Sequence, residues 1–277
     1  MPLKMGYKLA IFVSSIYRFF YKTDREAVKD NMRALFPDYN EKRLDSMVRE
    51  LYINFGKYLI DFFRFSKIDN DYVKKYVKLE GIEHLTNALG GNKGVIAVTA
   101  HLGNWELGGV ILPLLNIPFA AVVLNHRNKE INSFFIRQRQ LTGAKVIPVG
   151  AGLRKCFSVL AENYVIALVG DRDYFGNGIE MDFLGKPTMV PRGPAVFSRR
   201  CGSPIVPCFM IRNEDDTFTF KFYEQINPVY TKDERRDLLE ATKKTAAILE
   251  EVIRQYPTQW HVFRRFWEKI NWERNSL

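Results

Sequence analysis

Cysteine is scarce in this sequence, and its three copies form no recognisable site. Cys156, Cys201 and Cys208 include no C-x-x-C pair and have no histidine at metal-ligand spacing, so the sequence predicts neither a disulfide framework nor a zinc site. All three lie in apolar segments, as small core residues do. We therefore expect free thiols in a reducing compartment, and no metal ligands.

A long hydrophobic run is also missing. The apolar stretch from Leu9 to Tyr17 is too short to span a bilayer. No small-residue cleavage site follows the N-terminal segment, and the charged residues Lys22, Asp24 and Arg25 come immediately after it, so a removable signal peptide is not predicted. Two alternatives remain for residues 1–20: a helix lying along a membrane surface, which suits the basic flanks and aromatic end, or an ordinary packed first helix.

Several functional signatures are absent. Neither G-x-S-x-G nor H-E-x-x-H occurs, so a serine esterase or a zinc protease has no supporting motif. Gly150-Ala-Gly152 lacks the third glycine and the Walker lysine of a phosphate loop, which leaves only a weak nucleotide signal. No zinc-finger spacing or RNA-binding aromatic signature is present, so nucleic acid is the least favoured partner.

The sequence does have an excess of positive charge. Its 41 Lys and Arg against 31 Asp and Glu give a net charge of +10 and a pI near 9.4. Such a balance predicts a polyanionic partner, and the absences above favour an anionic membrane surface or a phosphorylated substrate.

The hydrophobic pattern changes after Lys78. Residues 23–65 follow helical spacing, with a break at Pro37-Asp38, and beyond Lys78 short apolar runs alternate with helical segments. This predicts an α/β protein with a mixed, largely parallel central sheet flanked by helices, behind an N-terminal helical segment. We expect an N-terminal membrane-proximal segment at 1–75 and an α/β domain at 76–277. The expected strands cover 95–100, 119–124, 145–149, 165–169, 205–211 and 217–222, and the expected helices 130–141, 153–163 and 233–255.

One apolar strand ends in a histidine. His101 follows the run 95–100, and Glu106 comes five residues later. Residues five apart cannot share a face of one helix, but they can meet if His101 ends the strand and Glu106 lies in the first turn of a following helix capped by Asn104. A carboxylate on one imidazole nitrogen raises the basicity of the other, which can then accept a proton from a hydroxyl. The alternative is a histidine satisfied at a strand end and a glutamate on a solvated turn.

Polar clusters follow three of the expected strands. Besides His101 with Glu106, they are Asn125-His126-Arg127-Asn128 and Asp171-Arg172-Asp173. If the strands are parallel, all three clusters share one edge of the sheet, where α/β proteins bind ligands. Either of the last two could instead be an ordinary turn, and D-x-D is also found at the metal and nucleotide-sugar sites of glycosyltransferases.

Two arginines lie on the helix expected after the second cluster. Arg137 and Arg139 are two residues apart, so their side chains diverge and at most one faces the site.

The motifs together resemble one family. His101-Leu-Gly-Asn-Trp-Glu106 resembles the H-x-x-x-x-[DE] motif of the lysophospholipid acyltransferase superfamily, in the form found in bacterial lipid A late acyltransferases. The other matching elements run in order through most of the chain: Asn31 to Pro37 (N-x-x-x-x-F-P), Arg139 with Gly143 (R-x-x-x-G), Asp171-Arg172-Asp173, where relatives carry D-Q-D, Phe183 to Pro187, Gly193 to Pro207, Pro257 to Trp260 (P-x-Q-W), and Arg264 to Trp267. Arg172 departs from the usual glutamine.

The resemblance implies a glycerolipid acyltransferase-like fold and a metal-free, cofactor-free O-acyl transfer. An acyl thioester on acyl carrier protein or coenzyme A would donate to a hydroxyl of a lipid acceptor, first of all a lipid A precursor. His101 would be the general base and Glu106 would orient it. Arg127, Arg137, Arg139 and Arg192 are the cations implied for substrate phosphates, with Asp171 also in the binding site.

Other functions stay open at this point. The acceptor could be another glycolipid or a lysophospholipid. A metal-dependent glycosyltransferase built on Asp171-Arg172-Asp173 is a rival of a different class, and so is a non-catalytic membrane scaffold. For the acyltransferase we expect a protein at the cytoplasmic face of the inner membrane, either peripheral or weakly anchored by its N-terminal helix.

Overall fold

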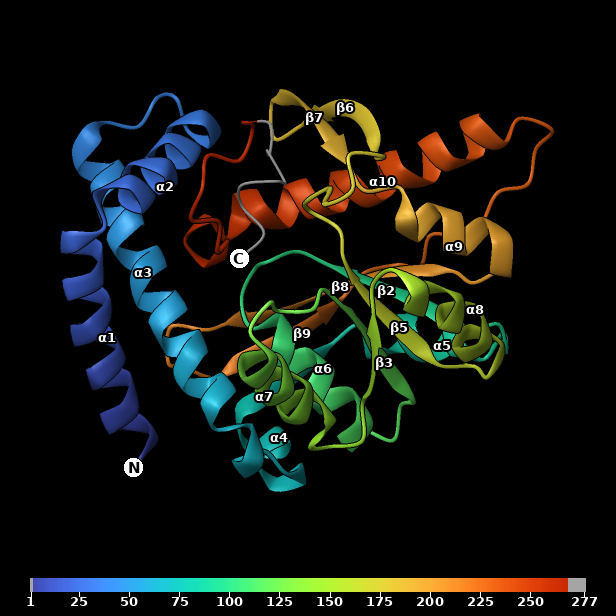
Figure 1. Ribbon diagram of the computed structural model, residues 1–277, viewed down its shortest axis with the longest axis horizontal. Helices are drawn as coiled ribbons and strands as arrows, with labels where there is room; N and C mark the ends of the chain where they lie inside the picture. The colour runs from blue at the N-terminus through green and yellow to red at the C-terminus, as the bar shows by residue number, and fades with distance from the viewer. Residues whose placement is uncertain (1, 269–277) are drawn as a thin grey trace.

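The computed structural model describes residues 2–268. A seven-stranded sheet lies between two layers of helices, and a bundle of N-terminal helices stands against one end of it (Figure 1). The helices are α1 (Leu3–Phe20), α2 (Lys22–Leu35), α3 (Glu41–Phe63), α4 (Asn70–Tyr76), α5 (Ile82–Leu89), α6 (Trp105–Leu114), α7 (Lys129–Gln140), α8 (Arg154–Ala161), α9 (Gly193–Cys201) and α10 (Glu234–Gln255), with short 3-10 turns η1 (Phe65–Lys67), η2 (Ala151–Leu153) and η3 (Pro257–Gln259).

The sheet has the order β1-β9-β8-β2-β5-β3-β4, and neighbouring strands are parallel except for β8 and β9. The mixed, largely parallel sheet predicted from the sequence is therefore confirmed. The strands are β1 (Val77–Glu80), β2 (Val95–Thr99), β3 (Phe119–Val123), β4 (Lys145–Pro148), β5 (Val165–Val169), β8 (Ile205–Arg212) and β9 (Phe218–Phe222), and β6 (Ile179–Phe183) pairs with β7 (Lys186–Val190) in a separate hairpin.

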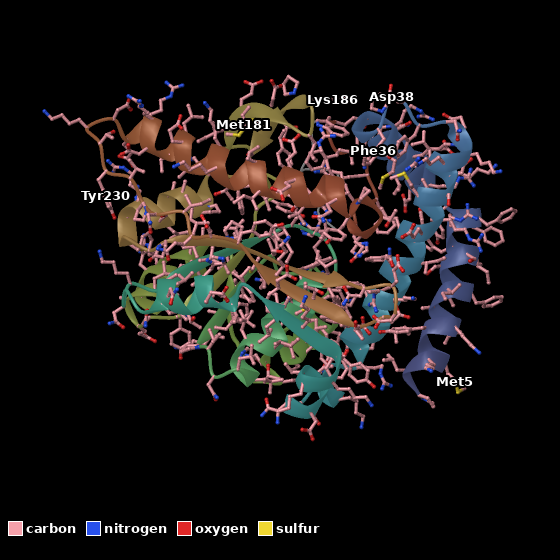
Figure 2. All side chains as sticks on the ribbon, turned by 180° about the vertical axis from the view of Figure 1, so that it is seen from behind. Met5, Phe36, Asp38, Met181, Lys186 and Tyr230 are labelled. Atoms are coloured by element: carbon pink, nitrogen blue, oxygen red, sulfur yellow. The ribbon has the colours of Figure 1, made fainter. Side chains whose placement is uncertain are left out.

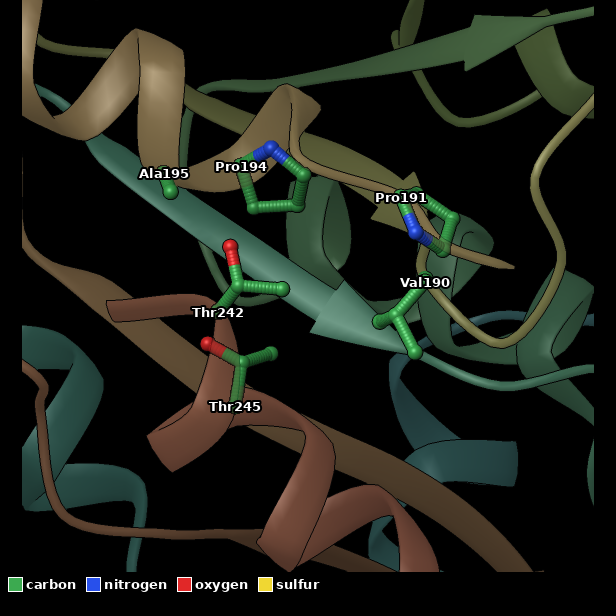
Figure 3. A pocket seen from close by; sticks show the side chains of 7 residues that line it. Val190, Pro191, Pro194, Ala195, Thr242 and Thr245 are labelled. Carbon is green, nitrogen blue, oxygen red and sulfur yellow. The ribbon is translucent and has the colours of Figure 1, made fainter. Parts of the chain in front are cut away.

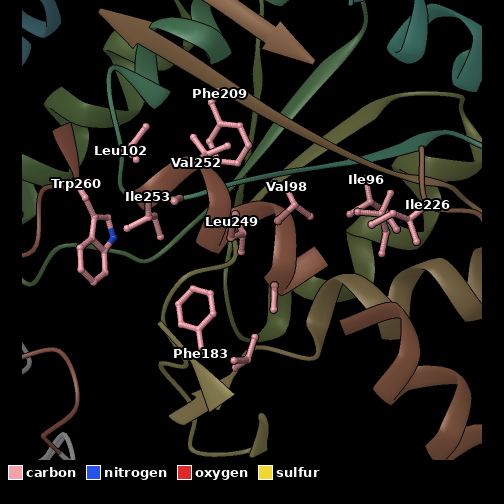
Figure 4. Packing of buried hydrophobic residues seen from close by; sticks show 14 of the residues in the cluster. Ile96, Val98, Leu102, Phe183, Phe209, Ile226, Leu249, Val252, Ile253 and Trp260 are labelled. Atoms are coloured by element: carbon pink, nitrogen blue, oxygen red, sulfur yellow. The ribbon is translucent and has the colours of Figure 1, made fainter. Parts of the chain in front are cut away.

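β2 lies at the centre of the sheet because every position of Val95–Val98 is apolar and buried on both faces. On one face, Val98 belongs to a buried cluster that also includes Leu249 and Val252 of α10, Phe183 and Trp260 (Figure 4). On the other face, α5, α6 and α7 cover the sheet together with Phe62 of α3. Both layers therefore fix the carboxyl end of β2, where His101 follows.

The start of α9 packs directly on α10. Pro194 and Ala195 face Thr242 and Thr245 (Figure 3), and the space among them is too small to hold a water molecule. This contact is closely packed.

Helix α1 packs on α3 through small residues. Ala10 and Ser14 are buried against Gly56, where a Cβ would overlap the Ser14 hydroxyl. The packed first helix weighed from the sequence is thus present, while its other face carries Phe12 and Phe19, which are 63% and 67% exposed. Each helix within residues 2–268 is too short or too polar to cross a bilayer.

The proposed division at residues 75 and 76 falls at the end of α4, just before β1. It stays a prediction. Residues 269–277 of the second segment lie outside the described part of the chain.

Candidate active site

The loop that follows β2 is fixed by its backbone. Gly103 has φ +63°, and a Cβ there would overlap the carbonyl oxygen of Met210, so only glycine fits without strain. The Gly103 amide donates to the Gln259 carbonyl at 2.9 Å and the Asn104 amide to the Met210 carbonyl at 2.8 Å. The end of β8 and the P-x-Q-W segment therefore hold the loop that carries His101.

Asn104 begins α6 as predicted. Its side-chain oxygen accepts from the Leu107 amide at 3.1 Å, and its side-chain nitrogen donates to Asp61 of α3 at 3.1 Å. The cap places Glu106 in the first turn of α6 and His101 outside the helix, as expected.

His101 pairs with Asp171 from the end of the neighbouring strand β5. Nδ1 of His101 lies 2.7 Å from Oδ1 of Asp171, and the Trp260 indole donates to Oδ2 at 2.9 Å. β2 and β5 are parallel and in register from Val95 and Val165 onward, which brings the two strand ends together. Because a carboxylate only accepts, the Asp171 pairing fixes the proton on Nδ1 and leaves Nε2 with a free lone pair.

The surroundings of the His101–Asp171 pair favour the neutral form of His101. Burial lowers the pKa of His101, Arg172 lowers it further, and Asp171 opposes them only in part. Burial disfavours ionisation of Asp171, but His101, Arg172 and Trp260 together hold the pKa of that carboxyl below its usual range. An ionised carboxylate beside a neutral imidazole is the state that a general base needs before the reaction.

The expected partnership of His101 with Glu106 is wrong. Glu106 is instead held by Arg139 of α7, which donates from Nε at 2.7 Å and from Nη2 to the second oxygen. The physical reason is that the start of α6 directs Glu106 toward α7, whereas β5 supplies a closer carboxylate to His101. Glu106 occupies the planar fork of Arg139, and the expected part of Arg139 in binding a substrate phosphate stays a prediction.

Asp171 is engaged within the protein by His101 and Trp260, and its expected part in substrate binding stays a prediction. Asp171 is 2% exposed and each of its oxygens accepts a hydrogen bond from the protein. Asp173 does not converge with it, since its oxygens accept from the Phe175 and Gly178 amides at 3.0 and 2.8 Å. The two carboxylates of D-x-D therefore have separate structural partners, which weighs against the glycosyltransferase alternative.

The other arginines expected at the site lie on the surface. Arg127 is exposed in the loop between β3 and α7, Arg137 is exposed on α7, and Arg192 is exposed at the start of α9. Within residues 2–268, Arg137 and Arg192 make no ion pair with Asp171 or Glu106. Their part in substrate binding stays a prediction.

Two residues of the site were not expected as such. Trp260 was recognised only as part of a family motif. His261 was not considered at all; its amide donates to the His101 carbonyl at 2.8 Å, and its ring lies among Phe55, Tyr58 and Trp105. Burial lowers the pKa of His261 to about 3, so it is neutral at physiological pH. The only available signal was its place directly after P-x-Q-W.

A small apolar cavity lies beneath α6, next to Trp105. Its volume is about 30 Å³, and its lining comes from α6 and the facing strands: Ala97, Thr99, Trp105, Gly108, Gly109, Leu112, Phe119, Ala167, Cys208, Met210 and Phe220. A Cβ at Gly108 would come within 3.1 Å of the Phe220 ring. The glycines thus permit close packing of α6 on the sheet, and a space about the size of one solvent molecule remains.

Comparisons with known proteins identify the family of this chain. The sequence model of the bacterial lipid A biosynthesis acyltransferase family matches residues 1–269. The chain belongs to this family. It is an acyltransferase of the lipid A and phosphatidylinositol mannoside type.

The relatives include enzymes for two kinds of glycolipid. A phosphatidylinositol mannoside acyltransferase of Mycolicibacterium smegmatis is 28% identical over 229 residues, covering 80% of this chain and 73% of the relative. The lipid A biosynthesis palmitoleoyltransferase of Escherichia coli K12 is 24% identical over 257 residues, covering 92% and 82%. The crystal structure of the 1-acyl-sn-glycerophosphate acyltransferase PlsC of Thermotoga maritima matches with 13% identity over 91% of this chain and 98% of that one, at a TM-score of 0.40, too low a score to relate the two structures in detail.

Proposed function

We propose that this protein transfers a fatty acyl group from an acyl thioester, carried by acyl carrier protein or coenzyme A, to a hydroxyl of a membrane glycolipid. The acceptor we propose first is a lipid A precursor, and the relatives that act on phosphatidylinositol mannosides support another glycolipid as the alternative. The observation that carries the proposal is the His101–Asp171 pair, which leaves Nε2 of a neutral imidazole as a base at the ligand-binding edge of the sheet.

In the reaction, Nε2 of His101 takes the proton of the acceptor hydroxyl as its oxygen bonds to the thioester carbonyl carbon. Asp171 stabilises the imidazolium that forms. Collapse of the tetrahedral intermediate breaks the carbon–sulfur bond, and His101 returns the proton to the departing sulfur. Glu106 and Arg139 tie α6 to α7 and so hold the walls of the site.

The negative oxygen of the intermediate needs hydrogen-bond donors. The Gly103 and Asn104 amides are already bonded to Gln259 and Met210. The remaining amides in the first turn of α6, whose N-terminus carries partial positive charge, and the Arg172 guanidinium are therefore the candidates.

The cavity beneath α6 supports an acyl site beside His101. It is lined by apolar groups and borders Trp105, whose ring centroid lies 5.4 Å from that of His101. Its volume of about 30 Å³ is too small for a long chain, so side chains around it have to move when the donor binds.

The test is lipid mass spectrometry of cells with and without the protein. We expect one lipid to lose an acyl chain when the gene is deleted, which identifies acceptor and chain length together. Wild-type protein should restore that chain, and His101→Ala should not, because loss of a positioned base costs roughly 100-fold or more in rate. His84→Ala, on α5 and not among the residues of the described site, serves as the matched control. A folded His101→Ala protein that restores the lipid normally would refute the mechanism.

A further inference from the structure

Arg172 and Arg264 approach one another from two segments that meet beside His101. Arg172 follows Asp171 at the end of β5, and its Nη2 donates to the His261 carbonyl at 3.1 Å. Arg264 lies three residues beyond His261, and its carbonyl accepts from Asn31 of α2 at 2.7 Å. Tyr174 belongs to the same group of side chains, because its ring centroid lies 6.3 Å from that of His101.

The two guanidinium groups lack full compensation by carboxylates. Nε of Arg172 is buried without a hydrogen-bond partner, and the nearest carboxylate oxygen, on Asp171, is 3.9 Å away. Asp171 is moreover committed to His101 and Trp260. In the part of the chain that the structure describes, Arg264 has no carboxylate within ion-pair distance, whereas the next residue, Arg265, pairs with Asp30 at 2.7 Å.

The positive charge of Arg172 affects the pKa of Arg264. Burial lowers the pKa of Arg264, the positive charge of Arg172 lowers it further, and Tyr174 and Asp171 oppose this. Burial raises the pKa of the Tyr174 phenol, and Arg172, to which it is hydrogen-bonded, opposes that rise. Positive charge held in a partly buried place without a matching anion is costly, so a bound anion would stabilise it.

We infer that Arg172, Arg264 and Tyr174 form a binding site for a phosphate group of the substrate, directly beside the His101–Asp171 pair. Two guanidinium forks and a phenol are suited to the oxygens of a phosphate ester. This inference rests on the proposed function for the identity of the substrate, but the site itself requires only the geometry of these three side chains.

The position of the site favours a phosphate on the acceptor. The whole length of the pantetheine arm separates the phosphate of either donor from its thioester carbon, whereas the guanidinium of Arg172 stands next to the residue that holds His101. A phosphate bound here is therefore close to the reacting hydroxyl, as a headgroup phosphate of a glycolipid would be. Arg172 and Arg264 would then help to determine which acceptor binds.

The experiment measures binding to the full chain by isothermal titration calorimetry, with two probes. One is short-chain phosphatidylinositol, which carries a headgroup phosphate, and the other is coenzyme A, which carries the phosphate of the donor arm. The variants are Arg264→Gln, Arg172→Gln and, as the matched control, Arg265→Gln. We expect Arg264→Gln and Arg172→Gln each to weaken phosphatidylinositol binding by roughly tenfold or more, the effect of losing a charge-assisted hydrogen bond. Both variants should bind coenzyme A as the wild type does, and Arg265→Gln should bind both probes with wild-type affinity.

The other outcomes are equally informative. If Arg264→Gln and Arg172→Gln lose coenzyme A binding but keep phosphatidylinositol binding, the site binds a phosphate of the donor and the assignment to the acceptor is wrong. Equal weakening by Arg265→Gln would show a general effect of surface charge and would overturn the site. Unchanged binding of both probes by Arg264→Gln would overturn it as well, because this substitution removes no hydrogen bond that the structure shows between protein segments. If wild-type protein binds phosphatidylinositol through Arg264 but transfers no acyl group, the proposed function fails and the phosphate site stands.

Discussion

Asp171 decides which nitrogen of His101 carries the proton. Replacing it by asparagine removes the negative charge that stabilises the imidazolium, and the amide can also hold the wrong tautomer. We expect Asp171→Asn to lower kcat roughly 100-fold or more without loss of structure by circular dichroism. Asp173→Asn is the matched control, because Asp173 accepts from the backbone amides of Phe175 and Gly178 in its own turn, and it should keep near-normal turnover. Similar rates for both variants would contradict the role assigned to Asp171.

The pH dependence of the reaction follows from the state of His101. Burial and Arg172 lower the pKa of His101 below its usual 6.5, so the free base persists to mildly acidic pH, and kcat/KM should fall only as pH drops through that lowered value. Removing the positive charge in Arg172→Gln should raise the pKa and move the acidic limb to higher pH. Arg192→Gln, at the exposed start of α9, should leave the limb in place. Rate profiles in overlapping buffers test this, and an unmoved limb in Arg172→Gln would contradict it.

At the scale of elements, the start of α6 depends on a neutral cap. Asn104 caps the helix and also donates to Asp61, a buried carboxyl whose pKa is raised by burial although Arg212 and Tyr7 oppose the rise. Aspartate is as good a helix cap as asparagine, but in Asn104→Asp it would place a second carboxylate against Asp61. We expect a loss of unfolding free energy on the order of 3 kcal/mol by chemical denaturation.

The control for that substitution is the cap of α3. Asn40 accepts from the Arg43 amide at 2.9 Å on an exposed turn, so Asn40→Asp should be neutral or slightly stabilising through the helix dipole. A stable Asn104→Asp protein would show that Asp61 is already protonated.

The same elements show what can be inferred from sequence. The strands with continuous apolar runs, such as β2 and β5, were predicted within a residue or two because burial on both faces leaves a clear pattern. β1, β6 and β7 were missed, since their half-exposed edges mix charged and apolar residues in short segments. Parallel strands were enough to bring His101 and Asp171 to one sheet edge.

The pairing within the site could not be inferred in the same way. Spacing along the chain favoured Glu106, but the direction of a side chain at the start of α6 depends on how that helix packs against α7. Arg139 pairs with Glu106 across 33 positions of the sequence, and Asp171 pairs with His101 across 70 positions. Such contacts leave no local periodicity to detect.

At the scale of the whole molecule, a buried polar network joins the first helix to the site. The Tyr7 hydroxyl of α1 donates to Asp61 at 2.6 Å, Arg212 of β8 is paired with the same carboxylate, and Asn104 completes the group. Because buried charges are stable only when fully paired, the position of α1 and the cap of α6 depend on one another. A helix with an exposed apolar face is thereby held rigidly to the segment that carries His101.

That helix is where we expect the protein to contact a membrane. Phe12 and Phe19 are exposed on α1, basic residues flank them, and the chain carries a net charge of +10. Burying one such ring is worth about 1.5–3 kcal/mol, so Phe12→Ser with Phe19→Ser should reduce flotation with anionic liposomes by more than tenfold.

Tyr230→Ser is the control, because Tyr230 is 60% exposed at the opposite end of the molecule from Met5 of α1 (Figure 2). Binding by the wild type should weaken as salt rises, since anionic lipid attracts the basic residues through screened charges. Equal loss in Tyr230→Ser, or binding that resists both high salt and carbonate, would mean that α1 is not the peripheral contact.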